Sequence, residues 1–141
     1  MRSIVLATLI AASSLAPALA DVRIRSSPGG QIGEFLEMFT AVRESGERVI
    51  IDGPCLSACT LVLGVVPKER ICVTPRAVFG FHAAWMPSGR GRNVPQPVAT
   101  KLMMEIYPSD VRGWINRRGG LNSHLMLLRG RELATFYPQC I

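Results

Sequence analysis

The sequence predicts a single α/β domain built around a parallel sheet. Short apolar segments of the strand type alternate with segments whose apolar residues recur every three to four positions, as on one face of a helix. Two strand-turn-helix units in series with short connections favour parallel strands joined by right-handed crossovers. The chain has 141 residues, 48% of them hydrophobic and 18% charged. This composition excludes an intrinsically disordered chain and fits one globular domain.

Residues 1–20 predict a secretory signal peptide. They carry one charge, Arg2, followed by an apolar run over residues 4–10, Pro17 and the small-residue site Ala18-Leu19-Ala20. The apolar run is shorter than the roughly 20 residues that cross a bilayer. We therefore expect export to the periplasm or the medium without stable membrane insertion, and a mature domain over residues 21–141.

The first half of the domain contains two expected strands and a helix. Residues 22–25 alternate apolar and polar side chains and end at the turn Pro28-Gly29-Gly30, which is typical of a short strand. Apolar residues at helical spacing predict a helix over residues 32–42, with Gly46 as its C-terminal cap. Residues 48–52 form an apolar run of the buried strand type.

The second half continues the alternation of strands and helices. The turn over residues 53–59 is expected to open a second apolar helix that ends near residue 63. Strands are predicted over residues 69–73 and 77–82, and helices over residues 98–106 and 109–118.

The chain is basic, with 16 Lys and Arg against 10 Asp and Glu and a formal net charge of +6. The arginines are scattered and are not interleaved with aromatic side chains, so we expect no nucleic-acid partner. Arg90 and Arg92 are the local concentration of charge. They lie in the segment Met86 to Pro97, whose glycines and prolines predict a mobile loop.

The carboxyl ends of the expected strands predict a shared site. Ligands bind there in open α/β sheets, where turns lead into helix N-termini. The turn Gly29-Gly30, Ser57 and His82 all fall at such ends. A serine nucleophile needs an imidazole within hydrogen-bond reach and backbone N–H groups for the oxyanion, and the N–H groups of Ala58 and of the glycine turn could supply the latter. The alternatives are a helix N-cap for Ser57 and a structural role for His82.

Three motifs resemble those of the Clp protease proteolytic subunit and, more closely, those of small exported proteins of the Clp protease/crotonase-like superfamily: Ser27-Pro28-Gly29-Gly30, Cys55-Leu56-Ser57-Ala58-Cys59 and Phe79-Gly80-Phe81-His82. The resemblance covers residues 22–84 and continues more weakly to the C-terminus. It implies a spiral of ββα units, N-terminally truncated because the signal peptide stands where the family's first unit would be. It also implies Ser57 as nucleophile, His82 as general base, and an oxyanion hole from the backbone of Gly30 and Ala58.

The family's third catalytic member is an Asp in the helical region after the histidine. The corresponding stretch, residues 120–124, has no carboxylate. Asn122 could orient His82 as an amide does in some cysteine proteases, and Asp110 and Glu105 are the other candidates.

The sequence therefore predicts an exported serine hydrolase that acts on a peptide or a small ester and uses no cofactor. The loop after His82 is expected to border the cleft, so that Arg90 and Arg92 favour anionic substrates. The alternative is a catalytically inactive binding or scaffolding module of the cell envelope, which keeps the fold without the chemistry. The oligomeric state stays open, with a homo-oligomer among the possibilities.

The four cysteines are expected to form two disulfides, since an exported protein can keep them. Four cysteines allow three pairings, and the first hypothesis joins Cys59 to Cys72 and Cys55 to Cys140. The spacing of these cysteines matches no standard pattern of zinc ligands, so no metal site is predicted.

Overall fold

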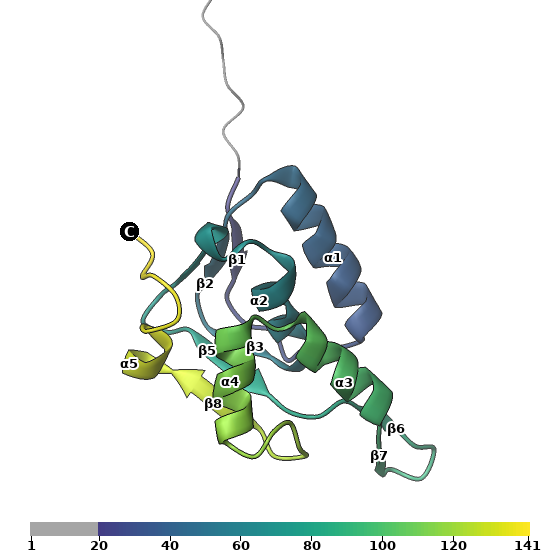
Figure 1. The fold of residues 1–141 in the computed structure, drawn as a ribbon. Coiled ribbons are helices and arrows are strands. Elements are labelled where there is room, and N and C mark those ends of the chain that lie inside the picture. The colour runs from purple at the N-terminus through teal and green to yellow at the C-terminus, as the bar shows by residue number, and fades with distance from the viewer. Residues whose placement is uncertain (1–19) are drawn as a thin grey trace, which may run out of the picture.

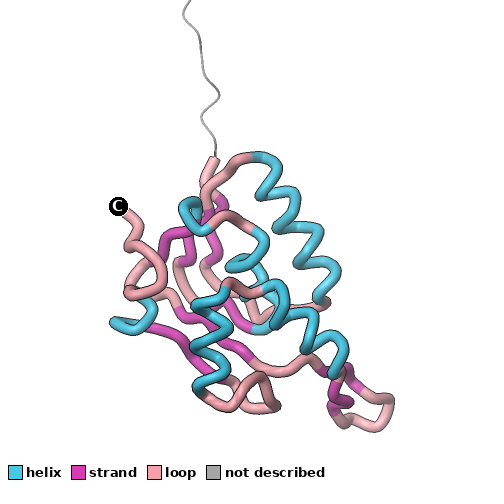
Figure 2. The backbone as a smooth tube through the Cα atoms, in the orientation of Figure 1, coloured by secondary structure: helices cyan, strands magenta, loops and turns pink. Residues whose placement is uncertain are grey.

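Two small β-sheets form the centre of the fold in the computed structural model, which describes residues 20–141. Figure 1 shows the strands beside a long helix, and Figure 2 shows the same arrangement with the strands in magenta and the helices in cyan. The protein is thus a small mixed α/β domain, as its sequence predicts. The predicted signal peptide lies outside the described residues, apart from Ala20.

The first sheet is parallel and has the strand order β1-β2-β4, from Val22–Ile24, Val49–Ile51 and Ile71–Val73. All three residues of β2 are buried because β2 is the central strand, so its sequence is a continuous apolar run rather than an alternation. Helix α1 (Ile32–Ser45) connects β1 to β2 and ends at Gly46, whose φ of 80° is the left-handed conformation of a helix C-cap.

The second sheet has the order β3-β5-β8, from Pro54–Leu56, Val78–Phe81 and Met126–Arg129. Strands β3 and β5 are parallel, whereas β8 pairs with β5 in the antiparallel sense. The expectation of one parallel sheet is therefore wrong. Only Asp52 and Gly53 separate β2 from β3. A three-residue strand so close to the preceding one shows no periodicity of its own, and its sequence resembles a turn.

The remaining helices are short. The apolar helix expected to end near residue 63 is a 3-10 turn followed by a single α-helical turn, and the elements that complete this part of the fold are η1 (Ser57–Leu61), α2 (Val62–Val65), η2 (Lys68–Arg70), α3 (Pro97–Ile106), α4 (Ser109–Arg117) and α5 (Gly130–Leu133). Within residues 20–141, none of the helices has the length and apolar character needed to cross a bilayer.

The segment predicted as a mobile loop is a β-hairpin, which corrects that prediction. Strands β6 (Trp85–Pro87) and β7 (Asn93–Pro95) are antiparallel, and the hairpin projects from the body of the domain at the lower right of Figure 1. The Ser88 N–H donates to the Arg92 carbonyl at 2.7 Å. Hydrogen-bonded and non-hydrogen-bonded pairs alternate in such a ladder. Pro87 and Pro95 therefore occupy non-hydrogen-bonded positions, where a missing N–H costs no ladder bond.

The core lies between the two sheets and the helices. The first half of the domain contributes the fully buried residues Phe39, Val49, Ile51, Leu61, Val62 and Phe79. Ile24, Phe35, Leu36 and Val78 are half-buried at its margin. The C-terminal half contributes Tyr107, Trp114 and Tyr137, which are the largest fully buried side chains.

All four cysteines form disulfides, but the pairing differs from the first hypothesis. Cys55 is joined to Cys59 and Cys72 to Cys140, with Cα–Cα distances of 5.3 and 5.0 Å. The first pair closes because the turn after β3 brings its two cysteines within disulfide range. The second closes because the C-terminal tail lies along β4, where the Cys140 N–H donates to the Val73 carbonyl. Two disulfides fit a protein of an oxidising compartment.

Candidate functional site

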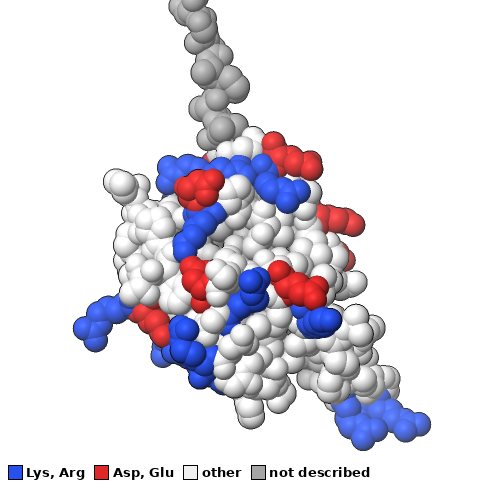
Figure 3. Space-filling model, viewed as in Figure 1, with Lys and Arg blue, Asp and Glu red and all other residues white. Residues whose placement is uncertain are grey.

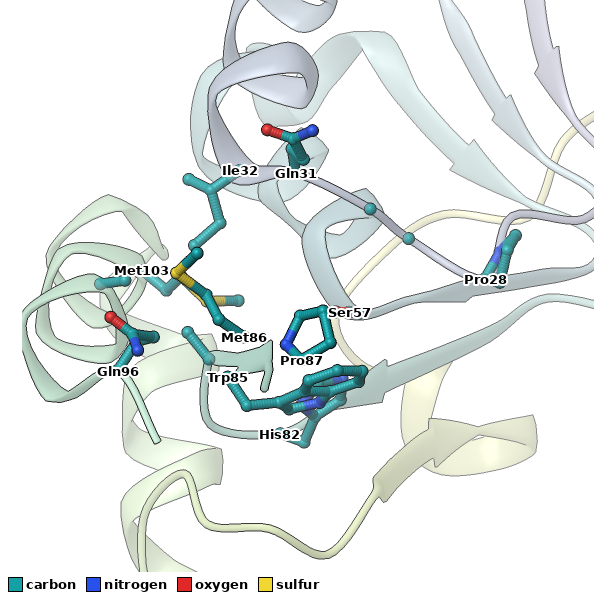
Figure 4. Close-up of a pocket in the computed structure, with 14 residues that line it drawn as sticks. Pro28, Gln31, Ile32, Ser57, His82, Trp85, Met86, Pro87, Gln96 and Met103 are labelled. Atoms are coloured by element: carbon teal, nitrogen blue, oxygen red, sulfur yellow. The ribbon is translucent and has the colours of Figure 1, made fainter. Parts of the chain in front are cut away.

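A cavity of about 730 Å³ lies between the start of α1, the turn after β3, the end of β5, the hairpin and α3 (Figure 4). The features that the sequence assigns to one site all line it, because the turn Gly29-Gly30, Ser57 and His82 are among its walls. Its other polar side chains are Gln31 and Gln96. The apolar part of the wall comes from Pro28, Ile32, Ala84, Trp85, Met86, Pro87, Ala99 and Met103.

Ser57 is held in an unusual backbone conformation. Its φ of 55° makes it the one non-glycine residue with a positive φ in the described part of the chain. Such a conformation costs about 1–3 kcal/mol and persists only where the surroundings enforce it. It occurs where β3 turns into η1, so the strand-to-helix turn is sharp. A sharp turn of this kind exposes a nucleophilic hydroxyl in hydrolases with a serine elbow.

Gly29 packs against this turn so closely that only glycine fits. A Cβ atom on Gly29 would lie 2.5 Å from the Ser57 Cβ and 2.6 Å from the Leu56 carbonyl oxygen. The φ of Gly29 is also 85°, in the left-handed region. The two turns are joined by a hydrogen bond of 2.9 Å from the Leu56 N–H to the Ser27 carbonyl. The glycine turn therefore fixes the position of the serine turn.

The N–H groups of Gly30, which lines the same cavity as Ser57, and of Ala58, which follows Ser57 in the chain, make no hydrogen bond within residues 20–141. Ala58 is the second residue of η1, so no carbonyl of that helix can accept its N–H. The Gly29 N–H, in contrast, donates to the Ser27 hydroxyl at 3.3 Å. The two N–H groups expected to form an oxyanion hole therefore have no hydrogen-bond acceptor among the described residues.

His82 follows β5 and is half-buried at the cavity wall. Its Nδ1 lies 2.7 Å from the Ala83 carbonyl oxygen. A carbonyl can only accept, so Nδ1 carries the proton and the Nε2 lone pair is left to accept another. No hydrogen bond joins Ser57 to His82 among the described side chains. Catalytic hydrogen bonds of this type are often long before substrate binds.

The Asn122 side chain does not orient His82, which corrects that expectation. Its Nδ2 donates to the Gly120 carbonyl at 3.2 Å, and its Oδ1 accepts the His124 N–H at 2.8 Å. The Asn122 backbone carbonyl instead accepts the Ala83 N–H at 2.7 Å. Asn122 therefore supports the strand end next to His82 through its backbone.

The two alternative orienting residues are engaged elsewhere. Asp110 pairs with Lys68 at 2.5 Å, and Glu105 pairs with Lys101 at 3.8 Å on the surface of α3. No carboxylate contacts His82 among the described residues. The Ala83 carbonyl occupies the position that an orienting acid would take. No sequence signal could have indicated it, because every residue has a backbone carbonyl.

Thr60 and Tyr107 support the backbone of Ser57, although sequence reasoning did not include them. The Thr60 hydroxyl donates to the Ser57 carbonyl at 2.6 Å, so the Tyr107 hydroxyl, 2.5 Å from the Thr60 oxygen, must donate to Thr60. Burial raises the pKa of Tyr107, which keeps its proton in place. This buried chain holds the Ser57 carbonyl. The three-residue spacing between Ser57 and Thr60 was the sequence signal that could have indicated this hydrogen bond.

Hairpin residues border the cavity as expected, but Arg90 and Arg92 are not among its lining residues. Both arginines are exposed near the tip of the hairpin, and Figure 3 shows Lys and Arg side chains gathered at that projecting end. Among the described residues, no Lys, Arg, Asp or Glu lines the cavity. The lining itself therefore provides no cationic side chain to pair with an anionic group.

Comparison with known proteins adds no assignment, since neither a protein-family model nor a curated protein matches the chain. Within residues 20–141, no three His, Cys, Asp or Glu side chains come together in a way that could hold a metal ion. The function is therefore argued from the geometry of the cavity.

Proposed function

We propose that the protein is an exported serine hydrolase of the Clp protease/crotonase-like type. Ser57 is the nucleophile, His82 is the general base, and the N–H groups of Gly30 and Ala58 bind the oxyanion. One observation carries the proposal: Ser57, at a sharp left-handed turn, shares a cavity wall with a histidine whose Nε2 is left to accept a proton. The order of glycine turn, elbow serine and strand-end histidine along the chain supports it, and the two disulfides support export.

The reaction begins when the Ser57 oxygen attacks the carbonyl carbon of the substrate and its proton passes to the Nε2 of His82. Negative charge develops on the former carbonyl oxygen, where unpaired N–H groups stabilise it. His82 then protonates the leaving group, and an acyl-enzyme forms on Ser57. Water, deprotonated by His82, hydrolyses this ester and restores the serine.

We expect slow turnover. The Ala83 carbonyl fixes the tautomer of His82 as an orienting acid would, but a neutral dipole stabilises the imidazolium less than a carboxylate does. In a known serine protease, replacing the orienting Asp lowers turnover by roughly 10⁴.

The cavity wall favours an uncharged substrate with an apolar group. Methionine, tryptophan and isoleucine side chains form much of the wall, and only Gln31 and Gln96 add polar side chains beyond Ser57 and His82. Burying a charged group there without a partner would be costly. A peptide or ester with an apolar acyl or side-chain group satisfies these surroundings.

The second candidate is a catalytically inactive binding module. Two observations favour it: no hydrogen bond joins Ser57 to His82, and no carboxylate contacts His82 within residues 20–141. In that case Ser57 serves only to begin η1, and the cavity binds an apolar ligand without reaction.

A fluorophosphonate probe separates the two candidates, because it reacts with an activated serine. We expect the disulfide-bonded protein to be labelled at Ser57, and both Ser57→Ala and His82→Ala to abolish labelling. Labelling should slow in acid, because a protonated imidazole cannot accept the serine proton. Ser123→Ala, at an exposed serine that does not line the cavity, is the control and should change nothing. A folded wild-type protein that resists the probe would eliminate the hydrolase and favour the binding module.

A further inference from the structure

We propose that the Cys55–Cys59 disulfide is a positioning device that holds Ser57 in the conformation needed of a nucleophile. The inference rests on the proposed function and names the residues that set the geometry of that site. The two cysteines flank Ser57 at equal distances along the chain, and the disulfide closes the strand-to-helix turn around it.

The closure of the turn explains the backbone of Ser57. Four extended residues span roughly 13 Å, yet the Cα atoms of Cys55 and Cys59 are 5.3 Å apart. The chain must therefore leave the extended path of β3 and fold back over the three residues between them. Ser57, in the middle, has the positive φ of 55°. In L-residues this conformation needs external support, and a covalent link across the reversal provides it.

The disulfide lies beneath the turn, whereas Ser57 faces the cavity. Cys55 and Cys59 are both fully buried, so they are sealed from dissolved thiols in the folded protein. The bond therefore acts as a permanent brace, and we do not infer a redox switch.

The other contacts of the turn are weaker restraints. Thr60 holds the Ser57 carbonyl by a hydrogen bond, and Gly29 packs against Leu56 and Ser57 without a covalent link to them. Neither fixes both ends of the reversal. Without the disulfide, Ser57 can relax to the ordinary helical region as a regular first residue of η1, which would rotate its hydroxyl away from His82.

The second disulfide provides a matched control. Cys72 and Cys140 are 68 residues apart along the chain, against four for Cys55 and Cys59, and none of these four side chains lines the cavity. Disulfide stabilisation grows with loop length in the chain-entropy model. If both disulfides only stabilise the fold, loss of the Cys72–Cys140 bond should have the larger effect on both stability and reactivity. If the Cys55–Cys59 bond positions Ser57, its loss should have the larger effect on reactivity.

The test compares the variants C55A/C59A and C72A/C140A by fluorophosphonate labelling, at a temperature where both are folded. We expect C55A/C59A to lower the maximal labelling rate kinact by about 100-fold, as a displacement of about 1 Å can, with the half-saturating probe concentration KI unchanged because the cavity wall is intact. C72A/C140A should label like the wild type, although it melts earlier. A wild-type kinact in folded C55A/C59A would overturn the proposal. If C55A/C59A does not fold, Cys55→Val with Cys59→Ala keeps more of the buried volume and should show the same loss.

A crystal structure of C55A/C59A provides a readout that does not depend on activity. We expect the φ of Ser57 to leave the positive range. A φ that stays near its present value would show that the disulfide does not hold Ser57 in this conformation. If the wild type is never labelled, the hydrolase proposal fails while this structural comparison still decides the role of the disulfide.

Discussion

Asp52 is an almost fully buried carboxylate at the end of β2. It accepts hydrogen bonds from Arg76 at 2.7 and 3.2 Å, from Thr74 at 2.9 Å and from Arg23 at 3.0 Å. Chiefly because of the Arg76 hydrogen bonds, the pKa of Asp52 lies well below its usual range. Asp52 thus ties the end of β2 to the turn before β5 and to β1.

This cluster predicts a loss of stability in acid. A carboxylate whose folded pKa is depressed stabilises the fold above its unfolded pKa of about 3.9, and the stabilisation is lost as the pH falls below that value. Asp52→Asn should lower the melting temperature at about pH 6 and reduce the further drop between about pH 6 and about pH 3. Thermal melts at both pH values test this. Glu34→Gln, at an exposed position of α1, is the control, and equal acid sensitivity in wild type and Asp52→Asn would contradict the assignment.

At the scale of residues, the sequence predicts where the site lies but not which contacts its residues make. Ser57 and His82 could be placed because strand ends and turns bring them to one edge. The orienting contact could not, because local turn geometry engages the Asn122 side chain with Gly120 and His124. The disulfide pairing also depends on close approach in space, which sequence spacing does not determine.

At the scale of elements, length decides what the sequence can predict. Helix α1 spans 14 residues with regular apolar spacing and a glycine cap, and it lies where it was expected. Strands β3, β6 and β7 have three residues each, and strands so short show no alternation. In β6 and β7, prolines at non-hydrogen-bonded positions further conceal the hairpin.

Two helical glycines predict opposite effects of the same substitution. A Cβ on Gly64 in α2 would lie 1.9 Å from the Ile106 carbonyl oxygen at the end of α3, whereas nothing lies within 4 Å of one on Gly33 in α1. Gly64→Ala should lower the free energy of unfolding by about 3 kcal/mol, since the two helices must separate. Gly33→Ala should raise it by about 0.5–1 kcal/mol, because alanine is the better helix former. Urea denaturation measures both, and a Gly64→Ala variant as stable as Gly33→Ala would mean that α2 does not pack on α3.

For the whole molecule, the alternation of strands and helices in the sequence predicts the mixed α/β class. It does not predict that the strands divide into two sheets. The sequence places β2 and β3 next to each other, while the chain changes sheet between them at Asp52 and Gly53. A Cβ on Gly53 would lie 2.0 Å from the Arg25 carbonyl oxygen. This close approach of two backbones turns the chain, and it depends on the folded arrangement of β1.

The C-terminal tail closes the edge of the first sheet. The Val73 N–H donates to the Pro138 carbonyl and the Val73 carbonyl accepts the Cys140 N–H, both at 3.0 Å, so the tail pairs with the outer side of β4. An uncovered strand edge is a site for pairing with other chains. The Cys72–Cys140 disulfide locks this tail onto the strand.

Removing that disulfide should therefore destabilise the domain and expose the edge of β4. The chain-entropy model assigns about 4 kcal/mol to a loop of this length and about 2 kcal/mol to the short Cys55–Cys59 loop. A small domain has only about 5–15 kcal/mol in total. C72A/C140A should thus lose roughly twice the free energy of unfolding that C55A/C59A loses, and it alone should form concentration-dependent aggregates, because only it releases the tail from β4. Urea denaturation and light scattering over a range of concentrations measure the two effects. If C72A/C140A is the more stable variant and stays monomeric, the tail holds its place through backbone pairing alone and the disulfide is not what protects the edge.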